Sequence, residues 1–237
     1  MSGDGDDRRV VLVTGAGGNL GRAVAATFAR GGDRLVLVER KLDALHARFG
    51  DDGDAQLLVA ADLLVAADAQ RVADTAMQRY GRVDVLCNLA GGFRMGEAVH
   101  ETTAATWDFL LDLNARTVLH MAHAVVPAML RRGRGWIVNV GAASAARGLA
   151  QMGAYTASKA VVQRLTEAMA AELRERGVNV NCVLPTVLDT PENRGSMPDV
   201  DPARWVAPDD LAAVIAFLAS DAARAVHGAS LPVSGLS

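Results

Sequence analysis

Residues 10–21 read VVLVTGAGGNLG, and this stretch decides the fold. Residues 10–13 are apolar and mostly β-branched, which is typical of a buried parallel strand. Glycines follow at once, and an alanine-rich helical pattern follows over residues 22–30. A strand, a glycine-rich turn and a helix form the phosphate-binding start of a dinucleotide-binding fold, because the free N–H groups of the first helical turn face an anion. A plain tight turn, or a site for the adenosine of a methyl donor, would give the same pattern.

Strand-like runs alternate with helical patterns along the chain. We expect strands near 10–14, 34–39, 56–61, 83–89, 135–140, 178–184 and 229–233, and helices near 19–31, 41–49, 67–80, 103–131, 154–176 and 208–220. Such alternation implies right-handed crossovers and a parallel sheet covered on both faces. The sequence therefore predicts an α/β fold with a single Rossmann-like, doubly wound, parallel seven-stranded sheet and helices on both faces. We expect residues 1–237 to form one domain, with residues 1–9 flexible.

Composition narrows the classes of function. The net charge of −3 indicates no nucleic-acid surface and no basic membrane patch, and no apolar run is long enough to span a bilayer. The first residues, MSGDGDDRR, lack the apolar core of a signal peptide. Cys87 and Cys182 lie in apolar runs, which favours buried reduced thiols in a cytoplasmic protein. His120 and His123 share a helix face without an evident third ligand, so we expect no metal site.

The ends of the expected strands carry residues suited to a cofactor. Glu39 lies about 20 residues past the glycines, where a carboxylate accepts from both ribose hydroxyls and repels a 2′-phosphate. The neighbouring Arg40 could instead pair with that phosphate or stack on adenine. Asp62 could meet the adenine edge or cap the following turn. Asn88, followed by small residues, suits the close approach of a ligand. We favour NAD(H) over NADP(H).

Three polar residues in expected helices suggest chemistry. Tyr155 and Lys159 are four apart and share a helix face. A nearby ammonium lowers the pKa of a phenol from about 10, so that the phenol can exchange a proton with a substrate oxygen while a hydride moves at carbon. An amphipathic helix face without chemistry is the alternative. Asn114 is a poor interior helix residue, so it either occupies a solvated face or marks a kink that holds a water.

Taken together, these segments resemble the short-chain dehydrogenase/reductase family over almost the whole chain. The matches are TGAGGNLG at 14–21, NLAG at 88–91, Asn114, and YTASK at 155–159. The resemblance implies an NAD(P)(H)-dependent oxidoreductase, similar to 3-oxoacyl reductases, that moves a hydride to or from a carbonyl or alcohol. It further implies a small-molecule substrate and a homodimer or homotetramer, with no nucleic-acid or membrane partner.

The resemblance also assigns roles to residues. Tyr155 would be the acid/base, Lys159 would hold the nicotinamide ribose and lower the pKa of Tyr155, and Asn114 would position a water in a proton relay. The implied cofactor-binding residues are Gly15, Gly18, Asn19, Leu20, Gly21, Glu39, Arg40, Asp62, Leu63, Asn88, Ala90, Gly91, Tyr155, Lys159, Pro185 and Thr190.

Three positions depart from the family pattern. Asn19 replaces the middle glycine, and we expect it to tolerate that geometry and serve as an N-cap. Gly18 stands where NADP-type members often carry a basic residue, which favours NAD. Ala142 replaces the substrate-positioning serine, and Ser144 is the candidate to replace it as a catalytic residue.

The missing serine leaves two other functions open. Dihydropteridine reductases, a divergent branch of the family, also lack it, and residues 188–198 with Trp205 are similar to theirs. That similarity gives pterin reduction as an alternative. A catalytically silent nucleotide sensor is the other alternative, although Tyr155, Lys159 and Asn114 together favour an enzyme. Phe93–Met95 could line either pocket or simply pack the loop.

Overall fold

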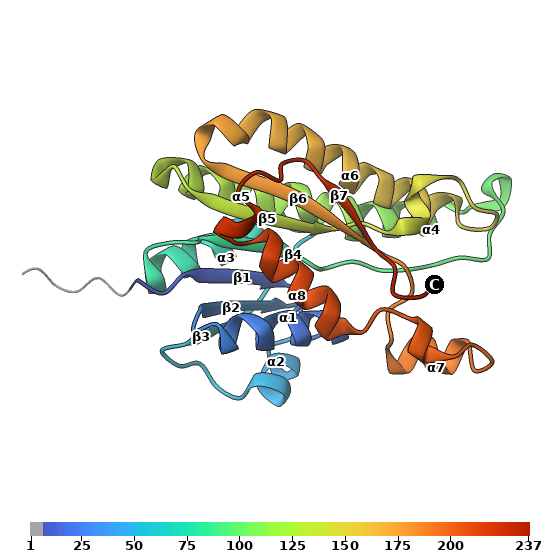
Figure 1. Ribbon diagram of the computed structural model, residues 1–237, viewed down its shortest axis with the longest axis horizontal. Coiled ribbons are helices and arrows are strands. Elements are labelled where there is room, and N and C mark those ends of the chain that lie inside the picture. The colour runs from blue at the N-terminus through green and yellow to red at the C-terminus, as the bar shows by residue number, and fades with distance from the viewer. Residues whose placement is uncertain (1–6) are drawn as a thin grey trace, which may run out of the picture.

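The computed structural model describes residues 7–237, and they form one parallel sheet of seven strands (Figure 1). The strands are β1 Val10–Thr14, β2 Arg34–Glu39, β3 Gln56–Ala60, β4 Val85–Asn88, β5 Gly135–Val140, β6 Val178–Pro185 and β7 Ser230–Val233. Their order across the sheet is β3-β2-β1-β4-β5-β6-β7. This is the predicted doubly wound sheet, and the strand order reverses between β1 and β4.

The helices follow the expected segments, with two differences. They are α1 Asn19–Arg30, α2 Leu42–Phe49, α3 Ala66–Tyr80, α4 Ala104–Leu111, α5 Thr117–Arg132, α6 Gly153–Leu173, α7 Pro191–Ser196 and α8 Pro208–Leu218. The helix expected over 103–131 is interrupted by a π-helical turn at Asp112–Arg116, which separates α4 from α5. Helix α7 was not predicted, because a helix of six residues shows too little periodicity; the Thr190 side chain caps it and Pro191 begins it.

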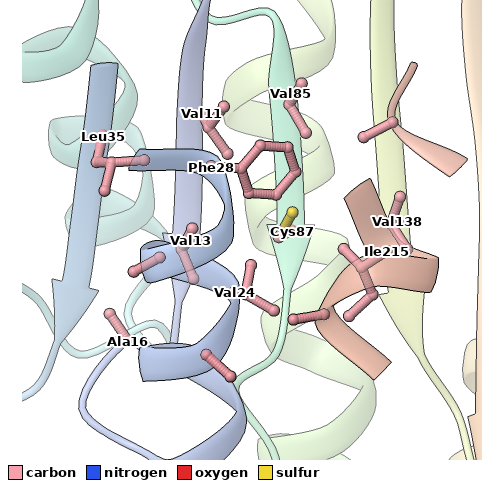
Figure 2. Close-up of a cluster of buried hydrophobic side chains, with 14 of the residues drawn as sticks. Val11, Val13, Ala16, Val24, Phe28, Leu35, Val85, Cys87, Val138 and Ile215 are labelled. Atoms are coloured by element: carbon pink, nitrogen blue, oxygen red, sulfur yellow. The ribbon is translucent and has the colours of Figure 1, made fainter. Parts of the chain in front are cut away.

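Alternate side chains of each strand face opposite layers of helices. On one face, Val11 and Cys87 pack with Phe28 of α1 and Ile215 of α8 (Figure 2). On the other face, Leu12, Leu86 and Ile137 pack against α3, α5 and α6. Fully burying a side chain such as Phe28 contributes roughly 1.5–3 kcal/mol, so these two layers supply most of the apolar stabilisation. They also hold the carboxyl ends of the strands in fixed register.

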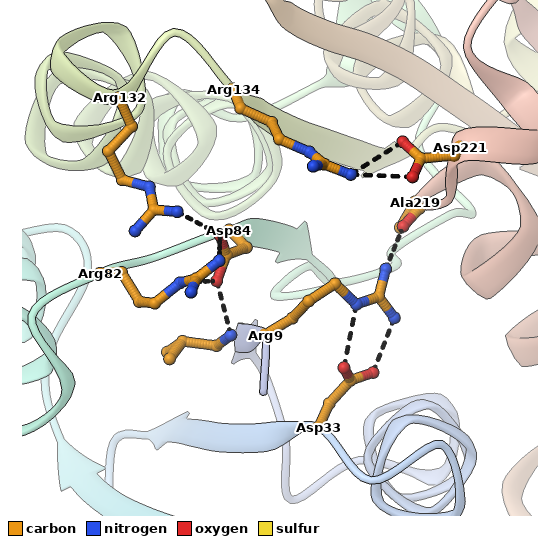
Figure 3. A network of polar contacts seen from close by, with 9 residues as sticks. Arg9, Asp33, Arg82, Asp84, Arg132, Arg134, Ala219 and Asp221 are labelled. Atoms are coloured by element: carbon orange, nitrogen blue, oxygen red, sulfur yellow. Dashed lines mark hydrogen bonds and ion pairs between the residues drawn. The ribbon is translucent and has the colours of Figure 1, made fainter. Parts of the chain in front are cut away.

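Ionic contacts fix the opposite, amino edge of the sheet (Figure 3). The buried carboxylate of Asp84 accepts from the Val10 N–H at 2.8 Å and from Arg82 at 2.7 Å. Arg9 pairs with Asp33 at 2.8 Å and donates to the carbonyl of Ala219 at 2.7 Å. Residues 1–6 of the segment expected to be flexible lie outside the described residues. The chain is therefore anchored just before β1 begins.

Both cysteines are free and buried, as predicted. Burial raises the pKa of the Cys182 thiol to about 11 and raises that of Cys87 further, so both thiols are protonated at neutral pH. Within residues 7–237, no helix combines the length and apolar character that crossing a bilayer requires. The same residues contain no group of three or more His, Cys, Asp or Glu side chains placed to hold a metal ion.

Candidate active site

The crevice at the strand reversal is built by β1, β4 and the glycine-rich turn. The Thr14 hydroxyl at the end of β1 accepts from the N–H groups of Leu89 and Ala90, at 3.0 and 3.1 Å, and so ties the two strand ends together. Gly15 has a φ of +64°, and a Cβ there would lie 3.0 Å from the Ala90 backbone. A Cβ on Gly21 would overlap the Gly15 carbonyl. Both glycines are therefore required by close approach.

The first turn of α1 is open toward this crevice. Its N-cap residue is Gly18, and no side chain caps it. The expectation that Asn19 would be the N-cap is wrong, because Asn19 is the first residue of the helix. Its side chain instead donates to the Glu192 carboxylate of α7 at 2.8 Å. The N–H groups of this turn remain available to an anion.

Glu39 lies against the glycine-rich turn. A Cβ on Gly17 would be 3.0 Å from Glu39 Oε2, and Glu39 Oε1 accepts from the Arg40 N–H at 2.9 Å. The Arg40 side chain is exposed. The Asp62 carboxylate accepts from the Leu64 N–H at 3.0 Å. One of its two oxygens therefore caps the following turn.

Asn114 lies in the π-helical turn between α4 and α5 and is only 1% exposed, so the solvated-face alternative is wrong. Its carbonyl oxygen accepts from the Gly92 N–H at 2.8 Å. Its amide donates to the Gly92 carbonyl at 3.1 Å and to Ser158 Oγ at 2.9 Å. Ser158 in turn donates to the Tyr155 carbonyl at 2.8 Å. π-Helical turns are rare overall, but those that occur are often found at functional sites. Through Asn114, this turn connects the loop after β4 with α6.

Lys159 is buried beneath the same loop. Its ammonium donates to the Val140 carbonyl at the end of β5, at 2.9 Å. A Cβ on Gly91 would lie 2.8 Å from Asn114 Oδ1 and 3.2 Å from Lys159 Nζ, so only glycine leaves room between the two side chains. Desolvation lowers the pKa of Lys159 to about 8.

Tyr155 lies at a cavity of about 140 Å³. The Phe93 ring meets the Tyr155 ring edge-to-face, with centroids 4.8 Å apart, while Arg94 and Met95 line the cavity. Burial raises the pKa of Tyr155 to about 12. The expected lowering of this pKa by Lys159 is not found, because desolvation dominates and the ammonium is bonded to Val140.

Neither Ala142 nor Ser144 brings a hydroxyl group to the cavity beside Tyr155. Ala142 is buried and brings only a methyl group. Ser144 lies in the 3₁₀ helix Ala143–Ala146, is half-buried, and is not among the residues that line the cavity beside Tyr155. The polar side chains that line this cavity besides Tyr155 are Arg94, Glu97, Thr102, Thr106 and Gln151.

A row of polar side chains lies just below the crevice. Asn88 of β4 donates to Asn139 of β5 at 2.8 Å, and Asn139 donates to Thr166 of α6 at 2.8 Å. Strand β6 ends at Pro185, and Thr190 follows five residues later in the sequence. The Thr190 hydroxyl accepts from the Asn193 N–H at 3.2 Å. These bonds fix the strand ends that carry the candidate site.

Sequence reasoning did not single out three residues that build this region. Thr14 and Ser158 stood inside the quoted segments TGAGGNLG and YTASK, so the signal for them was present. Gln151 carried no pattern, because its place beside Tyr155 depends on the shape of a loop.

The comparisons with known proteins agree with this geometry. The family model described as short chain dehydrogenase matches residues 9–201, and the chain belongs to that family. This places the protein among oxidoreductases that use NAD(P) nucleotides.

Among its relatives, the D-threitol dehydrogenase of Mycolicibacterium smegmatis is 37% identical, with 97% of this chain and 92% of the relative covered. The galactitol 2-dehydrogenase (L-tagatose-forming) of Cereibacter sphaeroides is 34% identical, with 97% and 94% covered. The crystal structure of the 3-ketoacyl-(acyl-carrier-protein) reductase of Brucella melitensis complexed with NADH is 32% identical. It superposes with a TM-score of 0.86 over 96% of this chain and 97% of that chain.

Proposed function

We propose that the protein transfers a hydride between a nicotinamide cofactor, NAD(H) in preference to NADP(H), and a small alcohol or the corresponding carbonyl compound. The observation that supports this proposal most strongly is that the side chains of Asn114 and Lys159 both lie against Gly91. Lys159 is one helical turn from Tyr155 on α6. A binding protein without chemistry has no evident need for all three side chains.

The residues present fit a dinucleotide. The uncapped first turn of α1, with Gly15, Gly18, Asn19, Leu20 and Gly21, would face the pyrophosphate. Glu39, held against Gly17, would accept from the ribose hydroxyls and repel a 2′-phosphate, which supports NAD. The remaining candidates are Arg40, Asp62 and Leu63 toward adenosine, and Asn88, Ala90, Gly91, Lys159, Pro185 and Thr190 toward the nicotinamide end. When bound, the nicotinamide supplies or accepts the hydride.

Tyr155 would handle the proton. In the reductive direction its hydroxyl donates the proton to the carbonyl oxygen as the carbon receives the hydride, which yields the alcohol. The raised pKa of Tyr155 keeps the phenol protonated and ready to donate. The phenolate left behind would be stabilised by the Lys159 ammonium on the same helix face. Oxidation of the alcohol runs these steps in reverse.

The cavity and the relatives together indicate the class of substrate. Glu97 accepts from the Thr106 hydroxyl at 2.7 Å and the Thr103 N–H at 3.0 Å, and these bonds lower the pKa of its carboxyl, so the cavity wall is polar and carries a carboxylate. Such a wall suits neutral molecules rich in hydroxyl groups. Two relatives are named for polyols, D-threitol and galactitol. A small polyol or its ketone is therefore the proposed substrate.

A homodimer or homotetramer is part of the proposal. Trp107 of α4 and Val161 of α6, two helices that pack against each other, are 44% and 38% exposed, and Leu119 of α5 is 55% exposed. Exposed large apolar side chains such as these are available for contact with a second copy of the chain. Light scattering that finds only a 24.8 kDa species would contradict it.

The test compares NAD⁺ with NADP⁺ in the oxidation of D-threitol and galactitol. It also compares NADH with NADPH in the reduction of ketones, 3-oxoacyl thioesters and quinonoid dihydropterin. We expect NAD⁺-dependent oxidation of a polyol. Turnover of the pterin alone would favour the dihydropteridine reductase alternative, and NADH binding without any turnover would favour the sensor.

A further inference from the structure

We propose that Gln151 is the residue that positions the substrate oxygen beside Tyr155, in place of the hydroxyl that Ala142 lacks. This inference rests on the proposed function. It assigns the task to a loop residue four positions before the tyrosine, and not to Ser144.

The first support is the set of free donors at the cavity. The hydroxyls of Thr102 and Thr106 already donate to the Ala98 carbonyl and to Glu97. Among the bonds of the described chain, the Gln151 side-chain amide takes part in none, although it has two donor hydrogens and an acceptor oxygen. Arg94 is the other free donor group, but it lies 3.8 Å from the centre of the Phe109 ring and brings a full charge. A neutral amide matches a carbonyl or hydroxyl oxygen better than a guanidinium does.

The second support is the backbone of Gln151. Within residues 7–237 it is the one non-glycine residue with a positive φ, 59°. A side chain in this region is strained, and glycine would remove the strain. The Gln151 carbonyl accepts from the Gly96 N–H at 2.9 Å, which joins the loop before α6 to the loop after β4. Gln151 is an exposed residue that lines the same cavity as Tyr155, and its backbone conformation belongs to the loop that brings it there.

The third observation is the position of Ser144, the other candidate for this role. Ser144 follows Ala142 by two residues in the 3₁₀ helix Ala143–Ala146, and it does not line the cavity. Ala142 is 5% exposed, and its methyl group offers no hydrogen-bond donor. Gln151 and Tyr155, by contrast, both line this cavity and are four residues apart in the sequence.

The experiment compares Gln151→Gly with Ser144→Ala, using NAD⁺ and D-threitol, or the best substrate of the panel above. Loss of one hydrogen bond to the substrate is expected to lower kcat/KM of Gln151→Gly about tenfold, mainly through KM. Its melting temperature should stay the same or rise because the strain is relieved, and its NADH affinity should not change. Ser144→Ala should retain wild-type kinetics.

Two results would overturn the inference: unchanged kcat/KM in Gln151→Gly, or a loss in Ser144→Ala equal to that in Gln151→Gly. If the wild type turns over substrate, Tyr155→Phe abolishes the turnover and Gln151→Gly is fully active, this inference fails while the proposed function stands. If the wild type turns over nothing in the panel, both fail.

Discussion

The side-chain amide of Asn19 donates to the carboxylate of Glu192 over 2.8 Å, and this bond joins the first turn of α1 to the first turn of α7. Asn19 stands at the position of the family's middle glycine, which has no side chain to make such a bond. Bonds from its own backbone N–H, from Thr190 and from Asn19 lower the pKa of Glu192, so this carboxylate is ionised at neutral pH. The contact lies at the two elements proposed to flank the cofactor.

We therefore predict that Asn19→Ala and Glu192→Gln each speed NADH dissociation in stopped-flow experiments, by about two- to tenfold. Because the two residues share one bond, the double variant should be no faster than the faster single variant. Asp199→Asn, which changes an exposed carboxylate just after α7 that makes no ion pair among the described residues, is the control and should match the wild type. Additive effects of the two substitutions would show that the bond does not couple them.

The position of the Glu39 carboxylate against Gly17 predicts a preference for NADH over NADPH. Glu39→Ala removes the carboxylate that would accept from the ribose hydroxyls and repel a 2′-phosphate, so the preference for NADH over NADPH should fall about tenfold or more. Asp43→Ala removes another carboxylate, in the first turn of α2, and should keep the preference because Asp43 is not among the candidate cofactor-binding residues. The ratio of kcat/KM values for the two cofactors measures this. An unchanged ratio in Glu39→Ala would remove the basis for preferring NAD.

Gly91 predicts a steric effect on the site. A Cβ there would collide with Asn114 Oδ1 and crowd Lys159 Nζ, so Gly91→Ala should lower kcat/KM by about 10- to 100-fold. Gly53→Ala is the matched control, because a Cβ at Gly53 meets nothing within 4 Å. Steady-state kinetics with circular dichroism, to verify folding, would test this. Equal activity of the two variants would show that the spacing at Gly91 is not critical.

The buried ammonium of Lys159 predicts a pH-dependent stability. Its pKa is about 8, below the ordinary 10.5, so the folded state bears the full cost of a buried charge below pH 8 and loses that cost as the pH rises toward 10.5. Lys159→Met should therefore exceed the wild type in free energy of unfolding at neutral pH by up to about 3 kcal/mol, less the lost bond to Val140. That advantage should shrink between pH 8 and 10.5.

Urea unfolding of both proteins at about pH 7 and about pH 10 measures the difference. Comparing the variant with the wild type cancels the titration of groups that do not interact with Lys159. Cys182 does interact with Lys159, but burial raises its pKa to about 11, above both measured pH values. A difference that does not change between these two pH values would mean that the pKa of Lys159 is not lowered in the folded protein.

Much of this architecture could be predicted from the sequence, because strand and helix periodicities and the glycine-rich turn are local signals. Asn114 shows where local signals end. Its poor helix propensity indicated an irregularity, but its bonds to Gly92 and Ser158 join segments that lie 22 and 44 residues away in the chain. The same holds for Asn19, whose partner Glu192 is 173 residues away. Gln151 was missed because the shape of its loop, and not a motif, brings it to the cavity.

Tyr155 is proposed to transfer the proton while the hydride moves, and the Tyr155→Phe variant removes the hydroxyl that this step requires. We would measure polyol oxidation with NAD⁺ and, on the same sample, NADH binding by fluorescence. We expect a loss of kcat of about 10³-fold or more with an NADH affinity close to that of the wild type, because only the hydroxyl is removed. Turnover that persists near the wild-type rate in Tyr155→Phe would contradict the account and require another proton donor.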